Sequence, residues 1–356
     1  MSKVIVGMSG GVDSSVAAYL LKKQGYDVVG VTMQIWQEDD REFIEESGGC
    51  CGLTAVDDAR RVAESLEIPY YVMNFRDEFR AQVIDYFVQE YLSGKTPNPC
   101  IACNRYVKWE SLLQRVLAIG GDYIATGHYA KVVELPNGRY SICRSASINK
   151  DQSYALYNLT QEQLEKTLMP CGSYRKEEIR TLAKELNLPV AHKPDSQDIC
   201  FVPDGDYASF IKKYTNLNIP TGNFVSMDGS ILGTHKGIIH YTVGQRKGLG
   251  IALGYPAFVL AIRPVTNEVV LGNYEESFVQ SLIARNVNFM SIEGLTKPRR
   301  LFAKIRYNHK GAWCTVRQTE VDEICCTFEE PERAVTPGQA VVLYDGDYVV
   351  AGGTIQ

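Results

Sequence analysis

The fold is decided near the start of the chain, by the stretch Lys3-Val4-Ile5-Val6-Gly7-Met8-Ser9-Gly10-Gly11-Val12-Asp13-Ser14. Its β-branched first half predicts a strand over 3–8, and apolar residues recurring between Val16 and Leu21 predict a helix directly behind it. The glycines between them let the backbone approach a phosphate closely, and the N–H groups at a helix start attract an anion. No Gly-Lys-Ser or Gly-Lys-Thr follows, which argues against an ordinary P-loop that transfers a terminal phosphate. We therefore predict a nucleotide-binding loop, with Asp13 as a candidate Mg²⁺ ligand.

Strands and helices alternate along the first part of the chain. The pattern predicts strands at 27–33, 70–74 and 123–126 and helices at 56–66 and 81–92. Such alternation is typical of a parallel sheet with helices on both faces. In these sheets ligands bind at the carboxyl ends of the strands. We therefore expect the loop at Ser9 to Ser14 and the turn Gly127-His128 to converge on one site.

The second part of the chain has a different character. From about Gly205 glycine is frequent and helical periodicity fades, with strand-like pieces at 237–243 and 257–262. Beyond Ser281 the strand-like pieces are short and separated by turns, which predicts a small antiparallel barrel. These pieces are 284–289, 300–306, 313–318 and 340–344.

The size of the chain supports a division into several domains. Its 356 residues exceed the range in which one hydrophobic core usually keeps growing. We predict an α/β protein with a parallel-sheet nucleotide-binding and catalytic domain over 1–204. A small central linking domain would follow over 205–280, and an antiparallel β-barrel over 281–356.

Composition limits the classes of protein to consider. The chain is 45% hydrophobic and 22% charged, and none of its apolar runs approaches the roughly 18 residues needed to span a bilayer. The first residues lack a secretory pattern, so we expect a cytoplasmic protein without a membrane partner. The net charge of -5 is opposite in sign to that of a general nucleic-acid coat protein. Any RNA would therefore meet local basic patches.

Ten cysteines in a cytoplasmic chain are not expected to form a disulfide framework. Cys100 and Cys103 form a Cys-x-x-Cys motif next to two prolines, and Cys200 lies in a polar, turn-rich setting that suits an accessible thiol. The residues alone leave three interpretations open: buried structural thiols, a zinc or iron–sulfur site, and a thiol pair for sulfur transfer. The adjacent Cys50 and Cys51 favour a packing or loop role.

One tract is basic in an otherwise acidic chain. Residues 297–310 contain lysines and arginines and no acidic residue, which is typical of a phosphate-binding surface. Tyr307 next to Arg306 favours RNA, since aromatic rings and guanidinium planes stack on unpaired bases. The alternative is a strand with a solvated basic face.

The loop resembles that of the ATP pyrophosphatases, and the whole chain resembles the tRNA-specific 2-thiouridylases nearly from end to end. The segments that carry the second resemblance are 7–14, Met33-Gln34-Ile35-Trp36, Thr96-Pro97-Asn98-Pro99, Ala125-Thr126-Gly127-His128-Tyr129-Ala130, Lys150-Asp151-Gln152-Ser153-Tyr154, 194–203 and His240-Tyr241-Thr242-Val243-Gly244-Gln245-Arg246-Lys247-Gly248. The resemblance implies ATP-dependent 2-thiolation of the wobble uridine of tRNA, through adenylation of its C2 oxygen. A cysteine desulfurase or sulfur-relay protein would supply sulfur, and the tRNAs would be those for lysine, glutamate and glutamine.

The resemblance also implies roles for individual residues. Cys200 would carry a persulfide, and Cys103 would complete the transfer and form a Cys103–Cys200 disulfide afterwards. ATP would be contacted by Gly7, Met8, Ser9, Gly10, Gly11, Val12, Asp13, Ser14, Met33 and Gly127. The tRNA would be contacted by Asn98, Pro99, Cys100, His128, Asn149, Lys150, Asp151, Arg306, Tyr307 and Gln339.

One departure from the family pattern keeps an alternative open. Many relatives have an aspartate at the position of Cys100, where it is assigned to contact the target base and assist proton transfer. Cys100, Cys103 and Cys200 would be a ligand set for a [4Fe-4S] cluster with one open iron. Two further alternatives are an ATP pyrophosphatase that joins a small acid to an amine, and an RNA-binding or sulfur-carrier protein that uses ATP only structurally.

Overall fold

The structure is a computed structural model and describes residues 1–35, 53–195 and 199–356. The chain folds into two compact units that alternate along the sequence. The first unit consists of Met1–Val83, Cys100–Gly205 and Asp347–Val349, and the second of Ile84–Pro99, Asp206–Gly346 and Val350–Gln356. This division does not test the domain boundaries at 204 and 280, which stay a prediction. Among the described helices, none has both the length and the apolar character needed to cross a bilayer.

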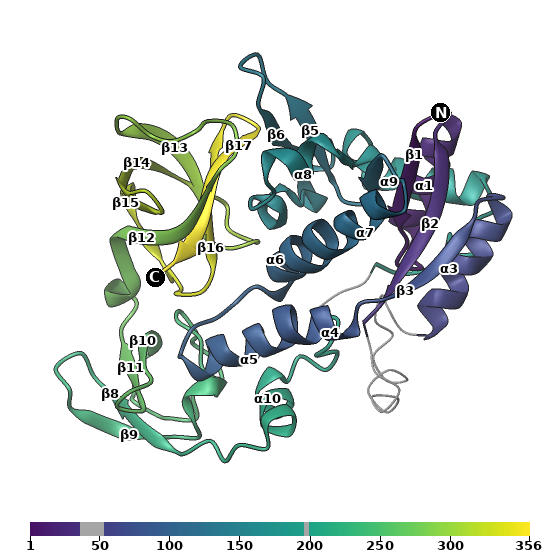
Figure 1. The fold of residues 1–356 in the computed structure, drawn as a ribbon. Helices are drawn as coiled ribbons and strands as arrows, with labels where there is room; N and C mark the ends of the chain where they lie inside the picture. The colour runs from purple at the N-terminus through teal and green to yellow at the C-terminus, as the bar shows by residue number, and fades with distance from the viewer. Residues whose placement is uncertain (36–52, 196–198) are drawn as a thin grey trace. The chain divides into compact units, whose positions relative to one another are not determined.

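The first unit contains a five-stranded sheet in the order β3-β2-β1-β4-β7. Its strands are β1 (Lys3–Gly7), β2 (Asp27–Gln34), β3 (Tyr70–Asn74), β4 (Tyr123–Ala125) and β7 (Thr167–Leu168). All four neighbouring pairs are parallel, as the alternating sequence predicts. The helices beside it are α1 (Val12–Lys23), α3 (Leu53–Ser65), α4 (Arg76–Phe79), α7 (Leu113–Ala118) and α9 (Lys176–Glu185) (Figure 1).

The core of this unit explains why β1 and α1 form where they do. Val4 and Val6 of β1 are fully buried, and Val16 and Leu21 of α1 bury the apolar stripe that helical spacing predicts. The remaining elements of the unit are α6 (Pro99–Ala102), the π-helix η3 (Cys103–Leu112), β5 (Ala130–Glu134), β6 (Tyr140–Arg144), η4 (Ile148–Lys150), η5 (Ser153–Leu156), α8 (Gln161–Glu165) and η6 (Pro170–Ser173). A π-helix, η2 (Arg80–Ile84), leads from α4 towards the second unit.

The second unit contains a four-stranded sheet and a barrel. The sheet has the order β10-β11-β8-β9, formed by β8 (Gly222–Val225), β9 (Ile231–His235), β10 (Phe258–Arg263) and β11 (Glu268–Gly272). Two helices belong to the same unit, α5 (Asp85–Leu92) and α10 (Tyr207–Thr215). Tyr214 of α10 donates a hydrogen bond of 2.6 Å to Asp85, and Phe210 packs edge-on against Phe87.

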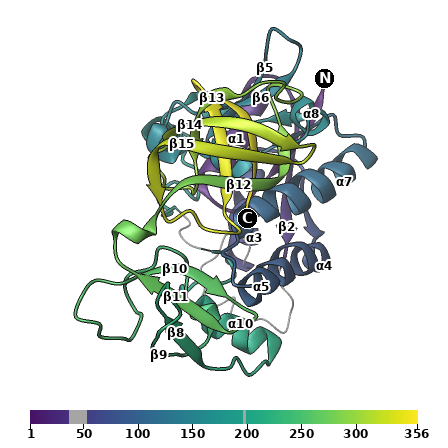
Figure 2. The same ribbon diagram turned by 90° about the vertical axis from the view of Figure 1, so that its left-hand side faces the viewer.

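The barrel has the strand order β12-β15-β14-β13-β16-β17 and is closed by pairing of β12 with β17 (Figure 2). Its strands are β12 (Phe278–Phe289), β13 (Arg299–Lys304), β14 (Ala312–Glu320), β15 (Glu323–Arg333), β16 (Ala340–Asp345) and β17 (Tyr348–Ile355). Alternate residues point inward, so that Leu301 and Ala303 are buried while Arg300, which precedes them, is exposed. The predicted antiparallel barrel, and with it the fold class, is confirmed.

Two predictions for the central region were wrong. The strand expected at 237–243 is a short 3-10 turn, η7 (Ile238–His240), because Gly237 has a φ of +116° and Tyr241 turns into a cluster with Phe224 and His235. Helical structure was not expected after Gly205, but α10 lies there. Asp206 caps this helix by accepting a hydrogen bond of 3.0 Å from the Ser209 N–H.

Candidate active site

The nucleotide loop between β1 and α1 is tightly packed. Gly10 has a φ of +65°, and a Cβ atom there would lie only 2.4 Å from the carbonyl oxygen of Ala55 in α3. Glycine is therefore required at this position. The Ser14 hydroxyl accepts a hydrogen bond of 3.2 Å from the Ser9 N–H and donates one of 3.3 Å to the Gly11 carbonyl. The N-cap of α1 is Gly11, and no side chain caps the first N–H groups of the helix, which suits an anion site.

The turn after β4 lies directly against this loop. Val6 of β1 pairs with Ala125 of β4, so both strands end on the same edge of the sheet. A Cβ atom on Gly127 would lie 2.6 Å from the Ser14 nitrogen. Gly7 ends β1, and Met33 lies near the end of β2 on the same sheet. The expected convergence of the two segments is confirmed, while contact of these residues with ATP stays a prediction.

Asp13 is held by three side chains of its own unit. Its carboxylate accepts hydrogen bonds from the Tyr129 hydroxyl at 2.7 Å and from Lys176 Nζ at 2.8 Å to each oxygen. The Cys171 thiol donates to the Asp13 carbonyl at 3.3 Å. Burial raises the pKa of Tyr129, and the charge of Asp13 raises it further, so the hydroxyl stays a donor.

This arrangement does not fit a metal ion bound by the protein alone. Both oxygens of Asp13 face the Lys176 ammonium, and within the described ranges no three His, Cys, Asp or Glu side chains are arranged to hold a metal. Mg²⁺ needs several oxygen ligands, often including the phosphates of a nucleotide. The same finding gives no support to a cluster held by Cys100, Cys103 and Cys200.

Asp195 connects the Cys200 segment to the same group of charges. It accepts bonds from Lys176 at 2.8 Å, Arg180 at 2.7 Å and Lys150 at 2.9 Å. Burial tends to raise the pKa of Asp195, but the hydrogen bonds from Lys150 and Lys176 outweigh it and hold that pKa below its usual range. Asp195 therefore stays ionised and holds cations from three places in the sequence.

The predicted thiols lie in the first unit. Cys103 is partly exposed and is the first residue of η3, and Cys100 is exposed in the preceding helical turn. The side chain of Asn104 bonds to the Ala155 carbonyl at 3.0 Å and to Lys108 at 2.8 Å, which fixes the start of η3. π-helical segments are rare and frequent at functional sites.

Cys200 is also partly exposed, and it precedes a firm anchor. The next residue, Phe201, is buried and packs edge-on against Phe79 with ring centroids 5.9 Å apart. Residues 196–198 and the Cys50-Cys51 pair lie outside the described residues. The pairing of Cys103 with Cys200 stays a prediction.

His128 has a structural hydrogen bond. Its Nδ1 lies 2.7 Å from the Thr126 hydroxyl, and its ring packs against Trp109 at 5.6 Å. Burial and, to a lesser extent, the Lys108 charge lower the pKa of His128. At neutral pH the ring is therefore uncharged, and its predicted contact with tRNA would be a neutral one.

The segment 149–151 divides into exposed and structural residues. Asn149 and Lys150 are exposed, although Lys150 already pairs with Asp195. Asp151 accepts hydrogen bonds from the Ser145 N–H at 3.0 Å and the Ser153 hydroxyl at 2.6 Å. Asp151 thus shapes its own turn, and its predicted contact with tRNA remains untested.

In the second unit, Gln339 holds the segment that precedes Asn98. Its side-chain amide donates to the carbonyls of Thr96 at 2.8 Å and Pro97 at 3.4 Å. The Thr96 N–H donates to the Pro337 carbonyl at 2.9 Å, and Gly338 lies so close that a Cβ atom there would be 3.0 Å from the Thr96 nitrogen. The turn at 336–339 therefore clamps the segment that leads into the Cys-x-x-Cys motif.

The basic tract at 297–310 is partly neutralised by acids from distant strands. Arg299 pairs with Asp345 at 2.5 Å, and Arg300 pairs with Glu329 at 2.6 Å. His309 approaches Glu332 at 3.1 Å. Tyr307 is 38% exposed, with Lys304 Nζ 5.9 Å from its ring centroid. Part of the tract is therefore the solvated basic face that the alternative interpretation expected.

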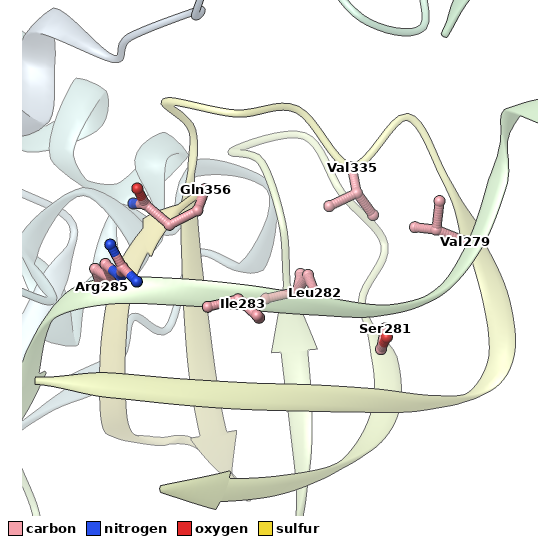
Figure 3. A pocket seen from close by; sticks show the side chains of 7 residues that line it. All are labelled: Val279, Ser281, Leu282, Ile283, Arg285, Val335 and Gln356. Carbon is pink, nitrogen blue, oxygen red and sulfur yellow. The ribbon is translucent and has the colours of Figure 1, made fainter. Parts of the chain in front are cut away.

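A pocket of about 410 Å³ on the barrel lies apart from these residues (Figure 3). It is lined by Val279, Ser281, Leu282, Ile283, Arg285, Val335 and Gln356. None of the residues predicted from the sequence to bind ATP or tRNA lines it. We assign no function to this pocket.

Comparison with known proteins places the chain in a family. Residues 2–204 match the family described as tRNA methyl transferase HUP domain, 208–273 the tRNA methyl transferase PRC-barrel domain, and 279–355 the aminomethyltransferase beta-barrel domain. A tRNA-specific 2-thiouridylase MnmA of Lachnoclostridium phytofermentans is 67% identical, covering 100% of this chain and 99% of the relative. The MnmA of Clostridium perfringens is 57% identical, covering 99% of this chain and 98% of the relative. The chain belongs to the tRNA-specific 2-thiouridylase family.

One solved structure with a much lower similarity is also found. A 4-thiouridine synthetase in complex with RNA and ATP is 17% identical, covering 60% of this chain and 50% of that chain with a TM-score of 0.32. A likeness at this level carries no argument about function.

Sequence reasoning on this thiouridylase missed several residues around the nucleotide loop. Tyr129 and Asp195 stand inside segments that carry the family resemblance, so a signal for them was present. Lys176 has no such signal, because it stands in an ordinary amphipathic helix. Lys193 also reaches the loop, where it bonds to the Gly10 carbonyl at 3.1 Å and pairs with Asp58 at 2.9 Å.

Proposed function

We propose that this chain catalyses the ATP-dependent 2-thiolation of the wobble uridine of tRNA, with Cys200 and Cys103 as the sulfur-transfer pair. The observation that carries the proposal is that the nucleotide loop and the two cysteines belong to the same unit. This one compact unit contains the uncapped nucleotide loop and the partly exposed Cys103 and Cys200. Membership in the thiouridylase family supports the substrate and the reaction.

The first step is adenylation of the uridine. Its O2 oxygen attacks the α-phosphorus of ATP, the bond from that phosphorus to the bridging oxygen breaks, and pyrophosphate leaves with the electron pair. The uridine N3 gives up its proton in this step. The oxygen, which is a poor leaving group by itself, now departs readily as part of AMP. The loop of Gly7 to Ser14, Met33 and Gly127 would bind the nucleotide, with phosphates at the start of α1.

The second step transfers sulfur. The terminal sulfur of a Cys200 persulfide attacks C2, and AMP leaves with the former O2 oxygen. The Cys103 thiolate then attacks the Cys200 sulfur, the bond to the transferred sulfur breaks, and 2-thiouridine is released as N3 regains a proton. Cys103 and Cys200 are oxidised to a disulfide while the transferred sulfur is reduced to the sulfide level. A cellular dithiol would reduce the disulfide before the next cycle.

Several partners belong to this proposal. Mg²⁺ would arrive with the phosphates of ATP and neutralise part of their charge. A cysteine desulfurase or sulfur-relay protein would supply the persulfide, in the cytoplasm. The tRNAs for lysine, glutamate and glutamine would be the substrates, contacted by Asn98, Pro99, Cys100, His128, Asn149, Lys150, Asp151, Arg306, Tyr307 and Gln339.

Single-turnover thiolation of unmodified tRNA tests the proposal, with ATP, Mg²⁺ and a persulfide donor added to iron-free protein. We expect Cys200→Ser to lower the rate by roughly 1,000-fold or more. Cys103→Ser should release pyrophosphate but leave the tRNA linked to Cys200 through the transferred sulfur. Cys325→Ser, a partly exposed cysteine on the barrel, is the matched control and should thiolate at the wild-type rate.

The other outcomes would point to the alternatives. Activity that requires iron and sulfide in anaerobically purified protein would replace the persulfide with a [4Fe-4S] mechanism on Cys100, Cys103 and Cys200. Activity that survives both cysteine substitutions would favour a ligase of the ATP pyrophosphatase type. Absence of pyrophosphate release with substrate tRNA would favour an RNA-binding or sulfur-carrier protein.

A further inference from the structure

A buried lysine stands at the beginning of α9, where a positive charge is poorly placed. The side chain of Lys176 is only 8% exposed, and Lys176 is the first residue of the helix. The start of a helix carries a partial positive charge that disfavours a cation. Lysines are almost never buried unless they are paired. The position of Lys176 therefore depends on the groups around its ammonium.

The groups around the Lys176 ammonium come from the nucleotide loop and from the segment that precedes Cys200. Nζ lies 2.8 Å from both carboxylate oxygens of Asp13 in the nucleotide loop and 2.8 Å from Asp195, five residues before Cys200. It also lies 5.3 Å from the centre of the Tyr129 ring, whose hydroxyl bonds to the same Asp13. The ammonium thus has a carboxylate on two sides and an aromatic face beside it.

The second carboxylate is itself firmly held. Asp195 also pairs with Arg180, one turn further along α9, and with Lys150. Because these partners fix Asp195, they fix the place of Lys176 between the two carboxylates. The loop contains no lysine of its own, and Lys176 and Lys193 reach it from other parts of the chain.

We propose that Lys176 is a positioning residue for the ATP reaction, which fixes the Asp13 carboxylate and with it the nucleotide loop, and that Asp195 acts through Lys176. The inference rests on the proposed function and adds to it two residues that act without touching the uridine. Asp13 is then an anchor of the loop rather than a ligand of Mg²⁺. Removal of Lys176 would leave Asp13 without its cation and free the loop to adopt other conformations.

The test measures binding of a non-hydrolysable ATP analogue, the KM for ATP and thermal unfolding in the full-length protein. We expect Lys176→Met to weaken analogue binding about tenfold or more and to raise the KM for ATP in tRNA thiolation. Lys184→Met is the matched control, because Lys184 is an exposed lysine on the same helix, and it should bind the analogue as the wild type does.

Asp195→Asn keeps the test decisive even if Lys176→Met fails to fold. It removes one partner of Lys176 and leaves Asp13 in place, so we expect a smaller loss of analogue binding, about threefold. In the double variant the two losses should not add, since Asp195 acts through Lys176. Additive losses, or wild-type analogue binding by a folded Lys176→Met, would overturn the inference. Wild-type protein that binds ATP but does not thiolate tRNA would instead refute the proposed function.

Discussion

The ion pairs around the nucleotide loop and those on the barrel differ in burial, although each pair joins a basic side chain to a carboxylate. The Lys176 side chain is 8% exposed and its partners Asp13 and Asp195 are 32% and 24% exposed. On the barrel, Arg300 and Glu329 are 56% and 47% exposed, and Arg299 and Asp345 are 40% and 61% exposed. In the first group the cation is enclosed by protein and its partners are mostly covered, whereas in the second group both partners face water.

This difference determines what each group can do. Exposed pairs typically contribute about 0.2 to 1 kcal/mol, so their partners can exchange for other charges such as phosphates. Removing one partner of a buried pair costs several times more, because the remaining charge is left without compensation. The charges at the loop therefore fix a geometry, whereas those on the barrel are able to bind and release a ligand.

The largest effect that follows concerns the close packing at the loop. Gly10→Ala places a Cβ atom 2.4 Å from the Ala55 carbonyl, so either the loop or α3 must move. Because misplacement by about 1 Å costs roughly 100-fold in rate, we expect ATP-dependent pyrophosphate release to fall by about that factor. Gly25→Ala is the matched control, with a φ of +89° and no atom within 4 Å of the new Cβ. It should cost about 1 to 2 kcal/mol of stability and leave the rate unchanged. Equal rates in the two variants would contradict the packing argument.

A smaller effect is expected at the turn that clamps the Cys-x-x-Cys segment. Gln339→Leu removes the donor to the Thr96 and Pro97 carbonyls and leaves these carbonyls without that partner. The loss is about 1 to 2 kcal/mol, which corresponds to a decrease of roughly 5-fold to 30-fold in the rate or the affinity that depends on this contact. If Gln339 positions this segment, the loss appears in the thiolation rate at saturating tRNA. If it contacts tRNA, as the resemblance implies, the loss appears in tRNA affinity. Gln356→Leu, an exposed glutamine at the end of the barrel, serves as the control.

The smallest effects are expected in the basic tract of the barrel. Arg306→Ala should weaken tRNA binding and lower the slope of log affinity against log salt by about 1. Arg300→Ala should change the slope less, because Glu329 already neutralises part of the Arg300 charge. Binding to unmodified tRNA at several salt concentrations measures both slopes. A larger change for Arg300→Ala would show that its pair opens on binding and would weaken the contrast between the two regions.

The sheet of the first unit was predictable because its signals are local. Alternating strand and helix patterns gave the positions of β1, α1, β2 and β3, and the rule for parallel sheets gave the convergence of Gly127 with the loop. Strands β5, β6, β8, β9, β11, β15 and β17 were overlooked, although the Asp345-Gly346 turn between two apolar runs was a local signal for β17. Tertiary pairing stabilises them, and it does not show in a single sequence.

The candidate site was predictable only where residues stand in a motif. The loop and the cysteines were found in this way, and the chain places them in one unit. Lys176 was not found in this way, because its partner Asp13 lies 163 residues away in the sequence and because Lys176 belongs to a helix of ordinary composition. The ion pairs of the basic tract were not predictable for the same reason, because Asp345 and Glu329 approach it from other strands.

The interleaving of the two units has a consequence for synthesis of the chain on the ribosome. The first unit includes Asp347–Val349, whose carbonyls accept hydrogen bonds from Ser141 and Arg144 in β6. The second unit includes Ile84–Pro99, and this segment is synthesised long before Gln339 of the barrel, which bonds to it. Neither unit is complete until the segments Asp347–Val349 and Val350–Gln356 have been synthesised. The apolar core of the first unit is formed by residues between 4 and 191, so what the growing chain leaves unpaired until late is the backbone edge at β6, which can be met by a strand of another chain in the meantime.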